Sequence, residues 1–181
     1  MKKTTILGIS GSFRADSTNT ILLKALEDLL PEGIDFVHFH GLDEIPHFSP
    51  GRDENEAVRQ FKNAITNADG VIICTPEYAF GVPGTLKNAL DWTVSTGEFN
   101  EKPVAAISAS PLNTGGEKAL ASLLLTLTAL GTVRNEDSAL SIPNVKQKIV
   151  NGSVTDPETR AALQNQCDNL LEIIALQKCT S

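Results

Sequence analysis

The chain has 181 residues, of which 41% are hydrophobic and 20% charged, with a formal net charge of −7. These values are ordinary for a soluble protein and predict one domain spanning residues 1–181. An acidic surface repels DNA, RNA and anionic lipid, so we expect neither nucleic acid nor membrane as a partner. No stretch approaches the ~18 apolar residues of a membrane span, and the first apolar run is too short for a signal peptide. The three cysteines form no metal or disulfide motif, which predicts a reducing, cytoplasmic environment.

Short apolar runs alternate with helical patterns along the whole chain. In order, we expect a strand over 6–9, a helix over 19–30, a strand over 34–39, a helix over about 54–68, a strand over 71–74, a helix over 86–94, a strand over 104–107, a helix over 119–130, a strand over 139–142 and a helix from 157. Asp156 is the expected N-cap of the last helix, with Pro157 at its first position. The pattern predicts an α/β fold, in which helices cover both faces of a parallel sheet. Ligands of such sheets bind at the carboxyl ends of the strands, so the loops after strands one, three and four are the candidate site.

The first loop reads Ser10-Gly11-Ser12-Phe13-Arg14-Ala15-Asp16-Ser17-Thr18-Asn19-Thr20. A loop rich in glycine and hydroxyls that opens a helix can surround a phosphate with backbone N–H groups, and the helix dipole favours the anion. Arg14 can add a charge-assisted hydrogen bond. The alternative is a serine-rich turn in which Ser17 or Asn19 simply caps the helix. The loop lacks the glycine pattern of a dinucleotide site, the Lys-Ser/Thr ending of a P-loop and a cysteine nucleophile, which favours a phosphomonoester that is held and not cleaved.

The second loop, Pro76-Glu77-Tyr78-Ala79-Phe80-Gly81-Val82-Pro83-Gly84, is stiff and mostly apolar. Its aromatic side chains could pack beside a flat ligand, or they could simply cover the edge of the sheet. The third loop, Ser108-Ala109-Ser110-Pro111-Leu112-Asn113-Thr114-Gly115-Gly116, ends in a glycine pair that allows close backbone approach to a ligand. It could equally be a well-capped turn.

The first and second loops, the latter continued by Thr85-Leu86-Lys87-Asn88-Ala89-Leu90-Asp91-Trp92, together resemble the NADPH-dependent FMN reductases over nearly the whole chain. The resemblance implies a flavodoxin-like, doubly wound five-stranded parallel sheet with strand order 2-1-3-4-5. It also implies non-covalent FMN, NADPH or NADH as co-substrate, and a homodimer or homotetramer. By motif position, the first loop would hold the FMN phosphate, residues 77–80 would border the isoalloxazine ring, and Ser110 would lie near the ribityl chain or the ring edge. The expected cofactor-binding residues are Ser10, Ser12, Phe13, Arg14, Ser17, Thr18, Asn19, Pro76, Glu77, Tyr78, Ala79, Phe80, Ser108 and Ser110.

The expected activity is transfer of hydride from NAD(P)H to FMN and then to a small acceptor: a flavin, a quinone, an azo compound or a metal oxyanion. Because the flavin carries the chemistry, no side chain is assigned as a catalytic acid or base. The three histidines are irregularly spaced and predict no metal site. Two positions depart from the family: Ala79 stands where many members have Asn, and Glu117-Lys118 where Arg is frequent. The alternative functions are a flavodoxin-type electron carrier reduced by a protein partner, and a protein that has lost the flavin.

Overall fold

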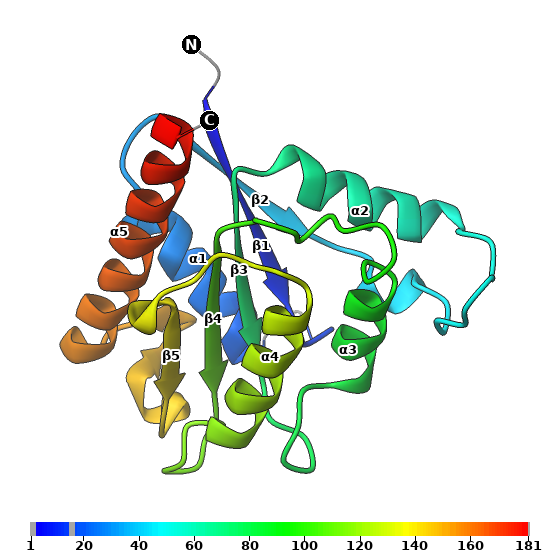
Figure 1. The fold of residues 1–181 in the computed structure, drawn as a ribbon. Coiled ribbons are helices and arrows are strands. Elements are labelled where there is room, and N and C mark those ends of the chain that lie inside the picture. The colour runs from blue at the N-terminus through cyan, green and yellow to red at the C-terminus, as the bar shows by residue number, and fades with distance from the viewer. Residues whose placement is uncertain (1–2, 15–16, 181) are drawn as a thin grey trace.

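The computed structural model describes residues 3–14 and 17–180, so Ala15 and Asp16 of the first loop lie outside the described residues. Strands and helices alternate as expected (Figure 1). They are β1 (Thr4–Ser10), α1 (Thr18–Leu29), β2 (Ile34–Phe39), α2 (Glu56–Asn67), β3 (Gly70–Thr75), α3 (Gly84–Asp91), β4 (Val104–Ala109), α4 (Glu117–Ala129), β5 (Ala139–Ile142) and α5 (Pro157–Thr180).

The five long strands form one parallel sheet with the order β2-β1-β3-β4-β5, which confirms the predicted flavodoxin-like topology. A second, two-stranded antiparallel sheet was not expected: β6 (Ile149–Val150) pairs with β7 (Ser153–Val154) between β5 and α5. Three short 3-10 helices in the described residues were also not predicted from the sequence. They are η1 (Leu42–Glu44), η2 (Glu136–Ser138) and η3 (Val145–Lys148).

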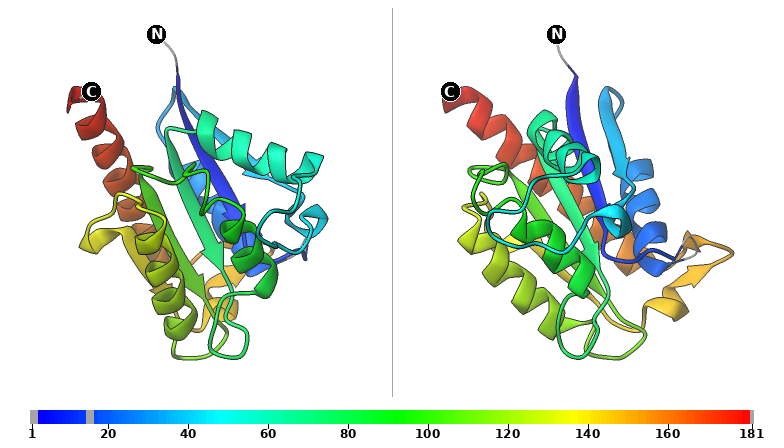
Figure 2. Two further views of the ribbon diagram at one scale, coloured as in Figure 1. Left: turned by 45° about the vertical axis from the view of Figure 1, so that its right-hand side comes forward. Right: turned by 90° about the vertical axis from the view of Figure 1, so that its right-hand side faces the viewer.

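Alternate side chains along the central strands build a separate hydrophobic core on each face of the sheet. Helices α2, α3 and α4 cover one face of the sheet, and α1 and α5 cover the other (Figure 2). Leu7 and Ile73 pack in the core on the first face, and Ile6 and Ile72 in the core on the second. All four of these side chains are at most 1% exposed. Burial on both faces explains why the strands read as continuous apolar runs in the sequence.

Two of the three cysteines lie in the core. Cys74 ends its run on β3 and Cys167 lies on the buried side of α5, and both are fully buried. Burial raises the pKa of the Cys74 thiol far above its usual range and that of Cys167 to about 12. Both thiols therefore stay protonated at neutral pH and act as small apolar side chains.

Side-chain hydrogen bonds to the first backbone N–H groups set where helices α1 and α5 begin. Thr20 donates its backbone N–H to the Ser17 hydroxyl at 3.1 Å, so α1 begins at Thr18. Asp156 caps α5 as expected, accepting the Thr159 backbone N–H at 2.9 Å. Helix α3 ends at Asp91, three residues before the expected position 94. Trp92, the next residue, is only 3% exposed and therefore belongs to the core.

Candidate functional site

A cavity of about 470 Å³ lies at the carboxyl ends of β1, β3 and β4, and we call it the main cavity. Its size falls within the range of about 300–1,000 Å³ that is usual for small-molecule sites. Nine of the predicted site residues line it: Ser12, Arg14, Ser17, Thr18, Asn19, Pro76, Glu77, Tyr78 and Ser110. The first and second loops, far apart in the sequence, therefore share one cavity, as the predicted parallel sheet requires.

One end of the main cavity is suited to an anion. The N-terminus of α1 borders it, and the first N–H groups of a helix have no partner within the helix. Arg14 approaches from the first loop and Lys146 from η3. Two cations and a helix N-terminus thus line one cavity in a protein whose net charge is −7.

Asn19 lies in the wall of this end with an unused hydrogen-bonding atom. Its side chain is 2% exposed, yet its buried Oδ1 has no hydrogen-bond partner in the described part of the chain. Such an atom costs stability unless a ligand or water satisfies it. Because half a turn of the amide exchanges its oxygen for its NH2 group, Asn19 can accept from a ligand hydroxyl or donate to a phosphate.

The other end of the main cavity is mostly apolar, with Pro76, Tyr78, Pro111 and Leu112 in its wall. The Tyr78 and Leu112 side chains are 57% and 62% exposed. Large apolar surfaces held at the mouth of a cavity are suited to contact with a flat ring. The wall of the main cavity therefore contains groups suited to an anion and groups suited to a planar ring.

Glu77 holds the second loop in place. Its Oε2 accepts the backbone N–H groups of Lys118 and Ala119, both at 3.0 Å, at the start of α4. The negative carboxylate also suits the positive end of the helix dipole. Gly116 lies next to this contact with a φ of 81°, a backbone conformation that residues with a side chain rarely adopt. The position of this loop is thus fixed by α4, a contact that sequence reasoning did not predict.

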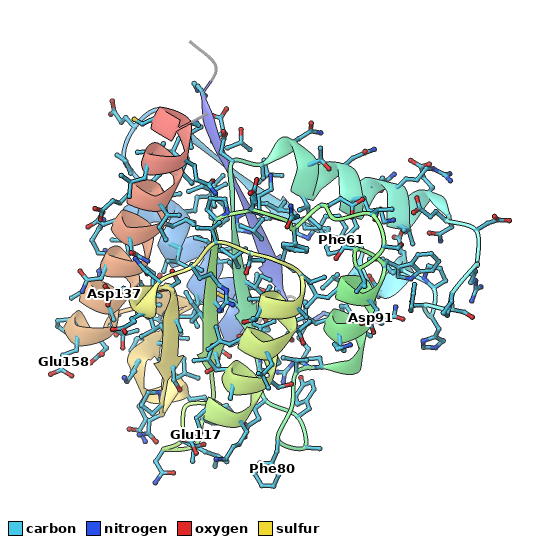
Figure 3. All side chains as sticks on the ribbon, in the orientation of Figure 1. Phe61, Phe80, Asp91, Glu117, Asp137 and Glu158 are labelled. Carbon is cyan, nitrogen blue, oxygen red and sulfur yellow. The ribbon has the colours of Figure 1, made fainter. Side chains whose placement is uncertain are left out.

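Ala79 and Phe80 form the tip of a tight hairpin. Tyr78 and Gly81 exchange two backbone hydrogen bonds, of 2.9 and 3.0 Å, and φ is 48° at Ala79 and 61° at Phe80. Positive φ at both central residues defines a type I′ turn, which favours Asn and Gly. Figure 3 shows Phe80 pointing away from the body of the protein, and its side chain is 79% exposed.

Five predicted residues lie outside the wall of the main cavity. Ala79 and Phe80 occupy the hairpin tip, and Ser10 and Phe13 line a neighbouring cavity beside β2. Ser108 is fully buried and donates its hydroxyl proton to the Gly115 carbonyl oxygen at 2.9 Å, so it braces the third loop.

Four residues of the main cavity wall were not among the predicted site residues: Ala109, Pro111 and Leu112 of the third loop, and Lys146, which lies outside all three predicted loops. Lys146 follows β5, whose carboxyl end lies at the same edge of the sheet as those of β1, β3 and β4. A lysine just after the fifth strand was the available signal. The prediction was limited to the loops after strands one, three and four, because ligands of such sheets bind where the strand order reverses.

No helix among the described residues is long and apolar enough to cross a membrane. Within residues 3–14 and 17–180, no group of three or more His, Cys, Asp or Glu side chains is placed to hold a metal ion.

The cavity chemistry fits a phosphorylated planar ligand such as FMN. The cations and the α1 N-terminus suit its phosphate, the unpartnered Asn19 oxygen suits a hydroxyl of its ribityl chain, and the apolar end suits its ring. A doubly wound parallel sheet with such a site at the carboxyl ends of its strands defines the class of flavodoxin-like proteins.

Comparison with known proteins narrows this class. The sequence model of the family described as NADPH-dependent FMN reductase matches residues 4–147. The chain is 36% identical to a 2-hydroxy-1,4-benzoquinone reductase of a Burkholderia species over 168 residues, which cover 88% of this chain and 90% of the relative. It is 30% identical over 171 residues to an NAD(P)H-dependent FMN reductase of Pseudomonas aeruginosa, covering 91% and 92% of the two chains.

Solved structures agree with this result. The flavoenzyme FerB, an NAD(P)H:(acceptor) oxidoreductase from Paracoccus denitrificans, superimposes with a TM-score of 0.81 at 32% identity, covering 95% of this chain and 97% of that one. The chain belongs to the NADPH-dependent FMN reductase family. It is therefore an FMN-dependent oxidoreductase that uses NAD(P)H as electron donor.

Proposed function

We propose that FMN binds in the main cavity with its phosphate at the first loop and its ring between the second and third loops. The observation that carries this proposal is that Arg14, Lys146 and the α1 N-terminus line the same cavity as the apolar side chains of the second and third loops. Ser12 and Thr18 add hydroxyl donors to the phosphate end. Ser17 contributes indirectly, because its hydroxyl accepts the Thr20 N–H and so fixes the start of the helix.

When bound, FMN supplies a ring that accepts hydride from NAD(P)H and passes electrons to the acceptor. The protein positions the ring and shapes its surroundings. Glu77 acts by fixing the second loop, since its Oε2 already accepts two N–H groups from α4. The exposed Tyr78 and Leu112 side chains leave apolar surface at the cavity mouth for a second flat molecule.

The acceptor we propose is a small quinone. The exposed apolar mouth suits a planar ring, and a relative that aligns over 90% of its own length is named for reduction of 2-hydroxy-1,4-benzoquinone. We further propose that the protein is cytoplasmic, because its cysteines are unpaired, and that it assembles as a homodimer or homotetramer. The exposed Leu125 and Val94 side chains, 74% and 64% accessible, are candidates for the contact between copies.

FMN titration tests the assignment of the site. A charge-assisted hydrogen bond contributes about 1.5–3 kcal/mol, so Arg14→Gln is expected to raise the Kd for FMN roughly 10- to 100-fold. Lys146→Gln is expected to have a smaller effect, because an ammonium group is a point charge and lacks the bidentate geometry of the Arg14 guanidinium. Lys178→Gln is the matched control: it removes the same charge at the opposite edge of the sheet, where Lys178 pairs with Asp69 at 2.9 Å. An unchanged Kd for Arg14→Gln would overturn the placement of the phosphate.

Anaerobic reduction of the flavin-loaded protein tests the function. Addition of NADPH or NADH is expected to bleach the bound-flavin absorbance, and 2-hydroxy-1,4-benzoquinone to restore it. Bound flavin that neither donor reduces would contradict the reductase and favour an electron carrier. Bound flavin that is reduced but not reoxidised by the quinone would refute the proposed acceptor only.

A further inference from the structure

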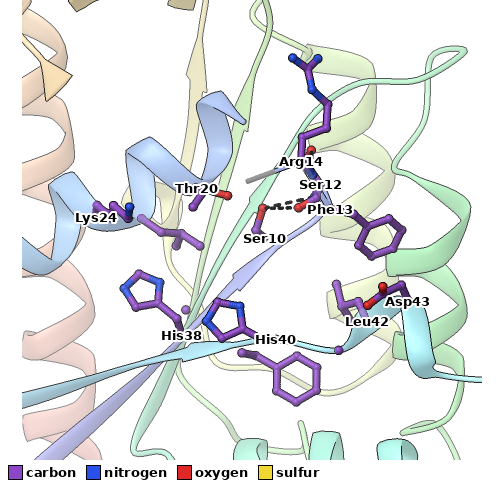
Figure 4. A pocket seen from close by; sticks show the side chains of 14 residues that line it. Ser10, Ser12, Phe13, Arg14, Thr20, Lys24, His38, His40, Leu42 and Asp43 are labelled. Carbon is purple, nitrogen blue, oxygen red and sulfur yellow. Dashed lines mark hydrogen bonds between the residues drawn. The ribbon is translucent and has the colours of Figure 1, made fainter. Parts of the chain in front are cut away.

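A second cavity, of about 420 Å³, lies beside the main cavity between α1 and the carboxyl ends of β1 and β2, and we call it the β2 cavity. Figure 4 shows its side chains. Lys24 and Thr20 come from α1, Ser10 from β1, and His38 and His40 from β2 and its end. Neither the family match nor any similarity reported above accounts for this group.

The polar character of the β2 cavity arises from a change along one face of β2. Ile34, Phe36, His38 and His40 alternate along the strand and so share a face, and the first two pack into the core beneath α1. At the carboxyl end, the same face carries two imidazoles in place of apolar side chains. Gly8 pairs in register with His38 and also lines the cavity, while the Phe36 ring occupies the space that a side chain at Gly8 would need.

The groups around this space are mainly donors and cations. Lys24 and Arg14 line the cavity, and the stacked His38 and His40 rings lie with their centroids 6.4 Å apart. His38 Nε2 contacts Glu27 Oε2 at 2.7 Å, which orients that ring. Asp43 is the acidic residue of the wall, and Figure 4 places it across the cavity from Lys24 and His38.

We propose that the β2 cavity is a second anion site, which takes a phosphate group through Lys24, His40 and the Thr20 hydroxyl, with His38 as a supporting wall. Two cations, two imidazoles and hydroxyl groups match the charge and the several acceptor oxygens of a phosphate. Arg14 lines both cavities and links this site to the main cavity. The phosphate could be free or belong to a nucleotide, including the 2′-phosphate of NADPH.

The three histidines make the site measurable by NMR, since His47 lies outside the β2 cavity and serves as an internal reference. The titration uses the FMN-loaded protein, so that inorganic phosphate cannot occupy the main cavity. Ionic strength is held constant with sodium chloride, and single His→Gln variants assign the imidazole C2–H resonances. Flavin absorbance in the same sample reports FMN retention, which separates failure of the cofactor assignment from failure of this proposal.

Inorganic phosphate is expected to shift the His38 and His40 resonances with saturation and to leave His47 unmoved. Lys24→Gln is expected to weaken this binding about three- to tenfold, whereas the control Lys178→Gln leaves it unchanged. Competition by 2′,5′-ADP but not by 5′-ADP would identify the NADPH phosphate as the occupant, and competition by neither would favour free phosphate. Equal shifts of all three histidines, no shift at all, or unchanged affinity in Lys24→Gln would overturn the proposal.

Discussion

The hairpin tip at Ala79 and Phe80 stores backbone strain that a single substitution should relieve. Both residues have positive φ, 48° and 61°, in a type I′ turn closed by two hydrogen bonds between Tyr78 and Gly81. The left-handed conformation costs an ordinary residue about 1–2 kcal/mol, whereas Asn adopts it readily. Ala79→Asn is therefore expected to raise the free energy of unfolding by about 1 kcal/mol.

The expected gain in unfolding free energy follows from the backbone preference of Asn and not from a new contact. It can therefore be tested against a matched control. Ala175 is exposed and lies in α5. There Ala→Asn should lower stability by up to about 0.7 kcal/mol, because Asn is the poorer helix former. Ala79→Gly should gain less than Ala79→Asn, since glycine also increases the entropy of the unfolded chain.

Urea unfolding at fixed FMN concentration measures these differences. In thermal unfolding of a chain of this length, a gain of about 1 kcal/mol corresponds to a rise of about 2–4 °C in Tm. Because Ala79 lies outside the main cavity wall, the Kd for FMN is expected to stay within about twofold of the unsubstituted protein. Equal or lower stability of Ala79→Asn, with an unchanged urea slope, would refute the argument from strain.

Three further predictions concern the interior, a helix cap and the thiols. The Lys62 side chain is 8% exposed and pairs with Glu54 and, at 3.9 Å, with Glu98. Lys62→Met is therefore expected to lower the free energy of unfolding, measured in urea, by about 3 kcal/mol. The control Lys178→Met is expected to change it little. Hydrogen bonds from the Thr159 side chain and backbone lower the pKa of Asp156. The Asp156 carboxylate therefore stabilises the fold above pH 3.8, and this contribution is lost as the pH falls through the lowered pKa. The stability difference between the native protein and Asp156→Asn should therefore shrink at acidic pH, and a constant difference would contradict the cap. A thiol reagent should rapidly modify only the exposed Cys179 in the folded protein, and all three cysteines after unfolding. Rapid reaction of a second cysteine in the folded protein would disprove the burial of the other two.

The sequence by itself determined the fold class and most of the main cavity. Strands buried on both faces must be apolar throughout, so the runs at 71–74 and 104–107 identify the centre of a parallel sheet without further information. Parallel strands end at one edge, and this rule alone brings the loops at 10–20 and 76–84 together. Capping is equally local, which is why Asp156 was predicted correctly as the start of α5.

The tertiary structure decided the features that depend on contacts between distant segments. The hydrogen bonds from Lys118 and Ala119 to Glu77 span more than forty residues, and no local pattern encodes them. The presence of Lys146 in the same cavity as Arg14 depends on β5 lying at the edge of the sheet next to β4. The positive φ at Ala79 is held by the hydrogen bonds between Tyr78 and Gly81 and by the contact of Glu77 with α4, against the preference of alanine itself. Local propensity sets which elements form, whereas packing among them sets which polar side chains meet.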